Sequence, residues 1–123
     1  MRKRVLTFGL ILSLSLSLIA CGASHKKPEG LSEDEYDAAL RVVETYDKYL
    51  DSNISEEEAY EEISSISNSW DSLDKEDSDD ATSTSLSSDI LLLSTYLFSG
   101  NSSDKKMTEQ RNAIAEKINE DTK

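Results

Sequence analysis

The sequence has 123 residues, with 13 Lys and Arg against 25 Asp and Glu, one His and one Cys, and a formal net charge of −12. This length allows one small domain, and a single cysteine excludes an internal disulfide framework. Nucleic-acid binding requires clustered basic residues, so we expect no nucleic-acid partner for so acidic a chain.

The first 20 residues have the layout of a secretory signal peptide. Residues 1–4 read Met-Arg-Lys-Arg, and residues 5–20 are uncharged, rich in Leu and end in Ala. A basic start, an apolar stretch and a small residue before the cleavage site define such a signal. The apolar stretch is short for a membrane-spanning helix, which needs about 20 residues. We therefore expect residues 1–20 to be removed, with an ordinary leader or an uncleaved membrane helix as alternatives.

The end of this segment, Leu18-Ile19-Ala20-Cys21, resembles the lipobox of bacterial lipoproteins. The resemblance implies that the Cys21 thiol is alkylated with a diacylglycerol and that a peptidase cuts between Ala20 and Cys21. Two acyl chains on one residue meet the physical requirement for a stable membrane anchor. The implied location is the extracytoplasmic face of the cell membrane. The overall pattern is more similar to a Gram-positive lipoprotein, although Gly22 leaves outer-membrane sorting in a Gram-negative host open.

Residues 21–31 are predicted to be the lipidated cysteine and a flexible tether. They contain two glycines and the only proline, and they show no apolar periodicity. His25 has no second His or free Cys to join it, so we do not expect it to bind a metal. After removal of the leader, ten basic residues remain against 25 acids, a charge of −15 that repels anionic lipid headgroups. We expect the single acidic domain, residues 32–121, to stand off the bilayer.

The domain begins with a predicted helix. Ser32 and Glu35 have the spacing of a capping box, and Leu31 with Tyr36 that of a hydrophobic staple. Apolar residues then recur at steps of three and four, which is typical of one buried helical face: Tyr36, Ala39, Leu40, Val43, Tyr46 and Leu50. The polar residues 51–53 end this pattern.

A second helix is predicted from the same signals. Ser55 and Glu58 repeat the capping box, and an apolar stripe follows at steps of four and three: Ala59, Ile63, Ile66, Trp70 and Leu73. Two helices joined by so short a break fold back as an antiparallel hairpin. The run 49–59 resembles a hairpin turn of many small Gram-positive proteins of unknown function, a resemblance that carries no activity.

Residues 71–89 contain seven acids and six serines, and we interpret the part up to about Asp80 as a polar, mobile connection. An EF-hand calcium loop needs Gly at position six and Glu at position twelve. Counting from Asp77, these positions hold Thr82 and Ser88, and counting from Asp74 fails in the same way. The sequence therefore favours a solvated loop, and we expect no metal site and no cofactor.

Two further helices complete the predicted bundle. The third has the stripe Leu86, Ile90, Leu93 and Leu97, and Leu91, Leu92, Tyr96 and Phe98 widen its apolar face, which predicts the central helix of the core. Gly100 and Asn101 are a typical stop. The fourth follows a cap at Ser102 or Ser103 and carries Met107, Ile114 and Ile118, interrupted by Arg111. The predicted fold is all-α, a small bundle of three to four helices built on the N-terminal hairpin.

The sequence gives no pattern for catalysis. The folded region has neither His nor Cys, which removes imidazole bases, thiol nucleophiles and zinc sites built on those ligands. Ser72 and Lys75 match the spacing Ser-x-x-Lys, but the partner motifs of that chemistry are absent. Acid pairs such as Glu57 with Glu61 are expected on a solvated helix face, and we predict no enzyme. Tyr49 and Tyr60 lie off the best stripes and are candidate surface contacts.

We therefore expect a membrane-anchored extracytoplasmic lipoprotein that acts as a non-catalytic protein-interaction module, with an envelope or extracellular protein as partner. One alternative is a ligand-capturing accessory lipoprotein for a transporter, although 103 residues are too few for the two lobes that such receptors usually have. Another is an exclusion or immunity lipoprotein of a phage or mobile element.

Overall fold

The computed structural model describes residues 27–100 and 102–120. These residues form four α-helices and one short 3-10 turn. Their bounds are α2 Glu33–Leu50, α3 Glu56–Ser69, η1 Trp70–Ser72, α4 Asp80–Ser99 and α5 Asp104–Lys117. The predicted all-α class is confirmed. The expected signal peptide, its lipobox and Cys21 lie outside the described residues.

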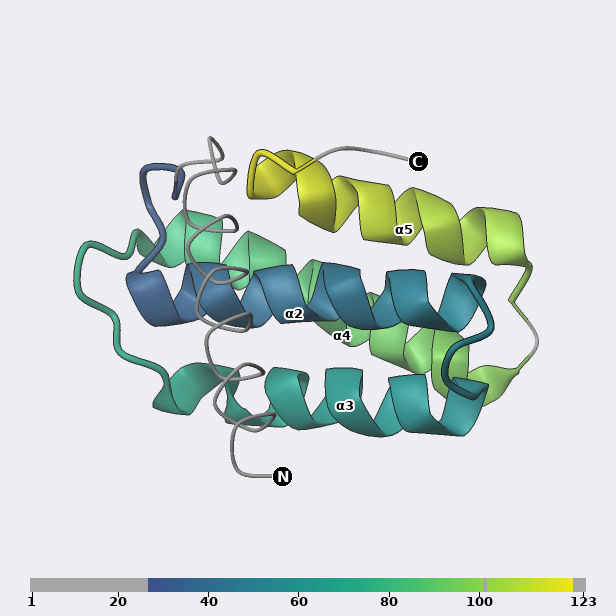
Figure 1. The fold of residues 1–123 in the computed structure, drawn as a ribbon. Helices are drawn as coiled ribbons and strands as arrows, with labels where there is room; N and C mark the ends of the chain where they lie inside the picture. The colour runs from purple at the N-terminus through teal and green to yellow at the C-terminus, as the bar shows by residue number, and fades with distance from the viewer. Residues whose placement is uncertain (1–26, 101, 121–123) are drawn as a thin grey trace, which may run out of the picture.

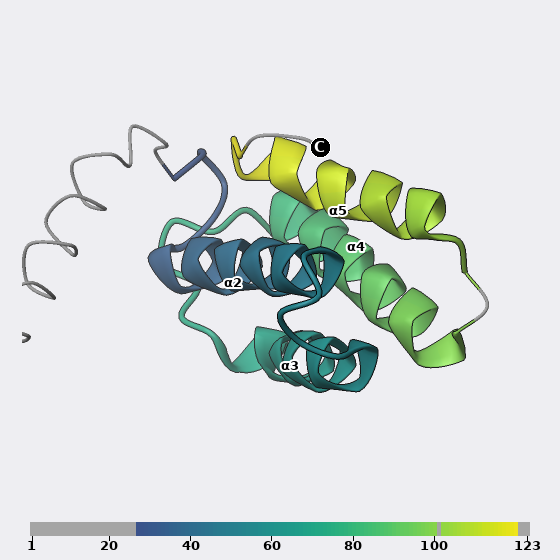
Figure 2. The same cartoon turned by 45° about the vertical axis from the view of Figure 1, so that its right-hand side comes forward.

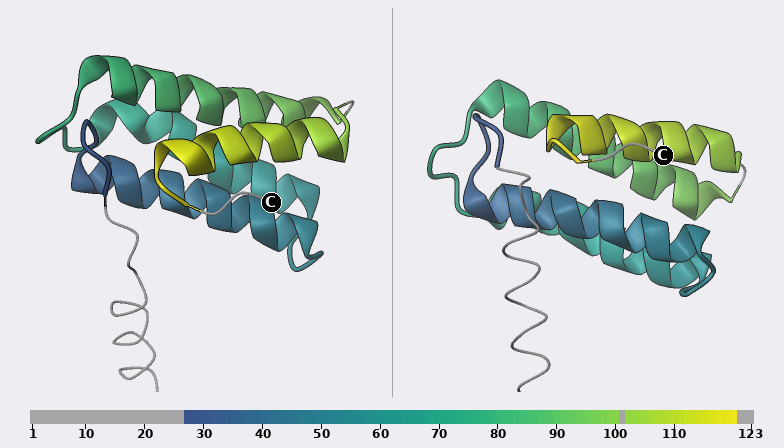
Figure 3. Two further views of the ribbon diagram at one scale, coloured as in Figure 1. Left: turned by 90° about the horizontal axis from the view of Figure 1, so that it is seen from above. Right: turned by 45° about the horizontal axis from the view of Figure 1, so that its top comes forward.

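The helices form an up-and-down bundle in which neighbours run antiparallel. Helices α2 and α3 form the predicted hairpin, and α4 and α5 form a second one that packs on the first (Figures 1 and 2). The segment that leads into α2 lies at the same end of the bundle as the α3–α4 connection, and the turn between α2 and α3 lies at the other end (Figures 1 and 3).

The helix starts follow from local capping. The hydroxyls of Ser32 and Ser55 accept hydrogen bonds from the backbone N–H of Glu35 and Glu58, whose carboxylates accept hydrogen bonds in return from the serine N–H groups, so both predicted capping boxes are present. Ser103 caps α5, one of the two residues expected there. A capping side chain stabilises a helix by about 1 kcal/mol, which explains why all three starts could be predicted.

The core runs the length of the bundle and takes side chains from all four helices. The buried apolar residues are Leu31, Ala38, Ala39, Val42, Val43, Tyr46, Ala59, Ile63, Ile66, Trp70, Leu86, Ile90, Leu93, Leu97, Met107, Ile114, Ala115 and Ile118. Most positions of the predicted stripes are among them. The exceptions include Leu40, Leu50 and Leu73, which are half-buried at the margin of the core.

The last residues of the predicted tether are packed on the domain. Leu31 is fully buried, and the carbonyl of Gly30 accepts a hydrogen bond of 2.8 Å from the N–H of Asp79, beside a bridge to Ser78. Gly30 has φ +92°, and a Cβ at this position would lie 2.9 Å from the hydroxyl oxygen of Thr82. The chain therefore becomes part of the domain at Gly30, and the acidic connection, which we expected to be mobile, is pinned there.

Candidate interaction surface

Chemically distinctive side chains gather in three places, and the first is a buried polar cluster around Glu35. Glu35 is fully buried. Its carboxylate accepts hydrogen bonds from the N–H of Ser32 at 3.0 Å, from Lys75 Nζ at 2.9 Å and from the hydroxyl of Ser83. Burial raises the pKa of Glu35, but these hydrogen bonds outweigh it and lower the pKa from 4.5 to about 2.

Trp70 closes this cluster. Its indole N–H donates to the Ser83 hydroxyl at 3.0 Å, and its carbonyl accepts from Lys75 Nζ at 2.8 Å. The same ammonium lies 5.4 Å from the centre of the Trp70 ring. The cluster thus joins the start of α2, the end of α3 and the start of α4. Because Glu35 stays ionised at neutral pH and its oxygens are already engaged, the cluster is structural.

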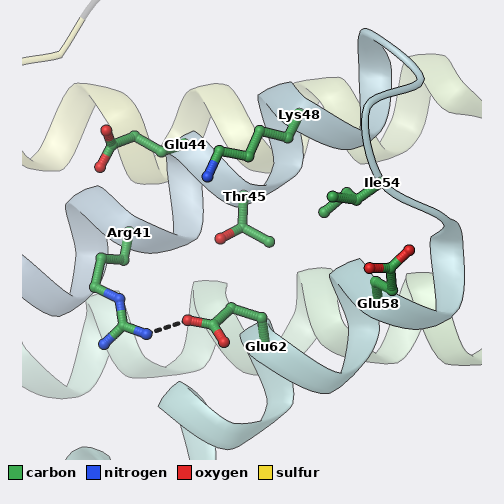
Figure 4. Close-up of a pocket in the computed structure, with 7 residues that line it drawn as sticks. All are labelled: Arg41, Glu44, Thr45, Lys48, Ile54, Glu58 and Glu62. Carbon is green, nitrogen blue, oxygen red and sulfur yellow. Dashed lines mark hydrogen bonds and ion pairs between the residues drawn. The ribbon is translucent and has the colours of Figure 1, made fainter. Parts of the chain in front are cut away.

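A charged groove lies between α2 and α3, with a volume of about 470 Å³ (Figure 4). It is lined by Arg41, Glu44, Thr45, Lys48, Ile54, Glu58 and Glu62. Figure 4 shows Arg41 and Glu62 pointing toward one another, and the two side chains form an ion pair. Opposite charges alternate along this groove, which is typical of a solvated face, so no one sign of charge is offered to a ligand.

The third place is an apolar strip on the outside of α4. Leu91, Leu92 and Phe98 are the exposed large hydrophobic residues among those described, and Phe98 has 73% of its surface exposed. The Phe98 ring packs against Tyr60 of α3 with a centroid distance of 5.3 Å. The exposed phenyl ring is therefore held in place by the neighbouring helix.

Two adjoining hollows run between α3 and α4 on this side. The first, about 320 Å³, is lined by Glu56, Glu57, Tyr60, Glu61, Leu97 and Phe98. The second, about 170 Å³, is lined by Tyr60, Ser64, Ser67, Asn68, Leu91, Ser94, Thr95 and Phe98. Tyr60 and Phe98 belong to both, so the contact between their rings lies where the two hollows meet. We name the two hollows together the α3–α4 groove.

The charge around the α3–α4 groove has one sign. Helix α3 carries five Glu and helix α4 carries two Asp, and neither has a Lys or Arg. Two of these seven acids form ion pairs with cations of other helices, Glu62 with Arg41 and Asp89 with Lys117. The three acids that line the groove, Glu56, Glu57 and Glu61, are exposed.

The structure places the predicted surface residues differently. Tyr60 lines the groove, whereas Tyr49 packs on Tyr46 at a centroid distance of 5.7 Å and donates a hydrogen bond to Glu56. Our assignment of Leu91, Leu92 and Phe98 to the widened core face of α4 was wrong, because all three are exposed. A helix packed against neighbours on one side buries one stripe. The breadth of the apolar face was the available sign that part of it stays outside.

Other kinds of site find no support in the described ranges. Within residues 27–100 and 102–120, no group of three or more His, Cys, Asp or Glu is placed to hold a metal ion. None of the helices in these ranges is both long enough and apolar enough to cross a membrane. Comparisons of the chain with models of protein families, with curated proteins and with solved structures found no match.

Proposed function

We propose that the chain is a lipid-anchored extracytoplasmic protein whose helical domain binds another envelope or extracellular protein through the α3–α4 groove, without catalysis. The observation that carries this proposal is Phe98, an aromatic side chain 73% exposed yet fixed against Tyr60 in a groove. Aromatic residues are enriched at the centres of protein interfaces. The lipobox-like sequence ending in Cys21 supports the anchor.

The geometry of the bundle supports the same function. The chain joins the domain at Gly30, at the end where α2 begins, whereas Tyr60 lies in the second turn of α3 and Phe98 in the last turn of α4, both toward the other end (Figure 1). The 18 residues of α2 span roughly 27 Å between these ends. A domain tethered through Cys21 therefore presents one end of the groove, formed by Glu56, Tyr60 and Phe98, on the side away from the anchor.

Site-specific photocrosslinking in intact cells tests the binding function. A photoreactive phenylalanine analogue replaces Phe98 in one variant and Glu109 in the control, because Glu109 is exposed on α5, which lies diagonally opposite α3. We expect a protein adduct from position 98 that position 109 does not give. Equal adducts at both positions, or none at 98, would contradict the proposed surface.

Mass spectrometry of the mature protein tests the anchor. We expect the N-terminal residue to be Cys21 carrying a diacylglycerol, and Cys21→Ser to abolish both the lipid mass and the cut before residue 21. An unmodified Cys21 in the mature wild-type protein would contradict the anchor and leave the crosslinking result to be judged alone.

A further inference from the structure

We infer that the occupant of the α3–α4 groove is a cationic amphipathic helix of the partner protein. This inference rests on the proposed function and adds the chemistry of the partner. It follows from the shape of the groove, from its charge and from the position of the anchor.

The shape of the groove fits a helix. Leu91, Thr95 and Phe98 follow one another at steps of four and three on α4, so they form one ridge about 10 Å long. The facing positions on α3 and α4 include small side chains, Ser64 and Ser94. A helix that lies along the groove can place apolar side chains at steps of three and four in the two hollows beside the contact of Tyr60 with Phe98.

The negative charge of the groove favours a partner helix with a positive net charge. Glu57 and Glu61 are four residues apart on the same face of α3, and Glu56 stands beside them at the end of the groove. Acids in the first turn also stabilise the helix start, but Glu61 lies beyond that turn. Because α3 and α4 contain no cation, Lys or Arg residues on the partner are the natural counterpart, and they would accelerate association.

The same charges disfavour the other occupants. A second copy of this chain would bring its own Glu56, Glu57 and Glu61 against the same three residues, and like charges at an interface are unfavourable. An anionic membrane surface is repelled in the same way, and the tether joins the domain at the end of the bundle far from the acidic part of the groove, Glu56, Glu57 and Glu61. A basic helix of another protein meets neither obstacle.

Binding of a designed peptide to the lipidated protein in neutral phosphatidylcholine nanodiscs tests the inference. The sequence has two Phe, and Phe8 is lost with the leader, so 4-fluorophenylalanine labels Phe98 alone in the mature chain. The probe is an 18-residue Leu/Lys helix. Its controls have the same Leu face with Glu for Lys, or the same Lys with Ser for Leu. We expect the fluorine resonance of Phe98 to move with the Leu/Lys peptide and with neither control.

Variants of the protein separate the groove from the general acidity of the domain. Glu57→Gln/Glu61→Gln should weaken binding of the Leu/Lys peptide at least tenfold. Glu33→Gln/Asp37→Asn, which removes two exposed acids at the same spacing on α2, should change it less than threefold. Equal weakening by the two pairs, or equal binding of the acidic peptide, would overturn the inference. Emission from the buried Trp70 reports that each variant is folded.

The two levels of the proposal fail in different ways. A position-98 adduct whose partner segment is acidic or uncharged, or is a second copy of this chain, overturns the cationic helix and leaves the binding function standing. An unmoved Phe98 resonance with the Leu/Lys peptide also overturns the cationic helix. Loss of the position-98 adduct itself overturns the binding function.

Discussion

Arg111 of α5 donates two hydrogen bonds to Asp47 of α2, from Nε to Oδ1 at 3.0 Å and from Nη2 to Oδ2 at 2.8 Å. The Arg111 side chain is 5% exposed and that of Asp47 is 25% exposed. A bidentate arginine–carboxylate pair is among the stronger polar contacts in proteins. The residue that interrupts the apolar stripe of α5 therefore ties this helix to α2.

We predict that replacing Asp47 destabilises the protein more than replacing Arg111. Asp47→Ala leaves a buried guanidinium without its carboxylate and should cost about 3 kcal/mol, the lower end for a broken buried pair. Arg111→Met keeps the buried volume and leaves Asp47, which can hydrate, so it should cost less. Urea unfolding of both variants measures the difference. A larger loss for Arg111→Met would contradict this account.

Glu35 should make the stability of the fold depend on pH in the acidic range. Its pKa is lowered in the folded state, so its stabilisation is complete above pH 4.5 and is lost as the pH falls toward about 2. The difference between 4.5 and about 2 corresponds to about 3 kcal/mol, at about 1.4 kcal/mol for each pH unit. Glu35→Gln should lose up to that amount at pH 7, and the gap from wild type should close by about pH 2. Urea unfolding across this range checks the prediction, and a gap that does not change with pH would refute it.

Two glycines with positive φ should respond differently to alanine. At Gly30 a Cβ would meet the Thr82 side chain at 2.9 Å, whereas at Gly100, with φ +66°, it would meet no atom within 4 Å. Gly100→Ala should therefore cost about 1–2 kcal/mol from backbone strain alone, and Gly30→Ala should cost more because the clash adds to it. Thermal melting compares the two variants. Equal losses would mean that the packing of Gly30 on α4 contributes little.

Substitutions at two neighbouring residues of α4, Leu97 and Phe98, should have different effects on stability, because one side chain is in the core and the other is on the surface. Leu97 is 2% exposed and Phe98 is 73% exposed. Leu97→Ala should lower the free energy of unfolding by about 2–5 kcal/mol, whereas Phe98→Ser should change it by about 0.5 kcal/mol or less. Phe98→Ser should nevertheless abolish binding of the Leu/Lys peptide. Chemical unfolding measures both. A loss above about 2 kcal/mol for Phe98→Ser would show that this ring supports the fold rather than an interface.

The fold could be predicted because its signals are local. The capping boxes at Ser32 and Ser55 act within three residues, and the apolar stripes repeat at the helical period. Arg111 could not be placed in the same way, because its role depends on Asp47, 64 residues earlier in the chain. The burial of Glu35 depends in turn on Lys75 and Ser83, which come from two other segments.

The candidate surface was harder to predict than the fold. Tyr60 stood out because it lies off its stripe, but Phe98 follows directly after the core residue Leu97 and looked like part of the same apolar face. Helical period alone cannot decide which side of a broad apolar face is covered, since the covering helix is set by the packing of the whole bundle. The exposure of Phe98 depends on where α3 and α5 pack against α4, and the sequence of α4 does not contain this information.

The attachment of Gly30 to Asp79 has a mechanical consequence. If Cys21 is fixed in the membrane and a partner pulls on Phe98, the load enters at one end of the bundle and leaves toward the other, nearly parallel to the helix axes. Gly30 passes this load to the connection before α4 through its hydrogen bond to Asp79, so the helices are loaded in shear rather than peeled apart one turn at a time. We expect the domain to unfold at a higher force when stretched between residues 27 and 98 than between residues 27 and 80, which lie at the same end of the bundle. Single-molecule stretching of the two geometries would measure the difference.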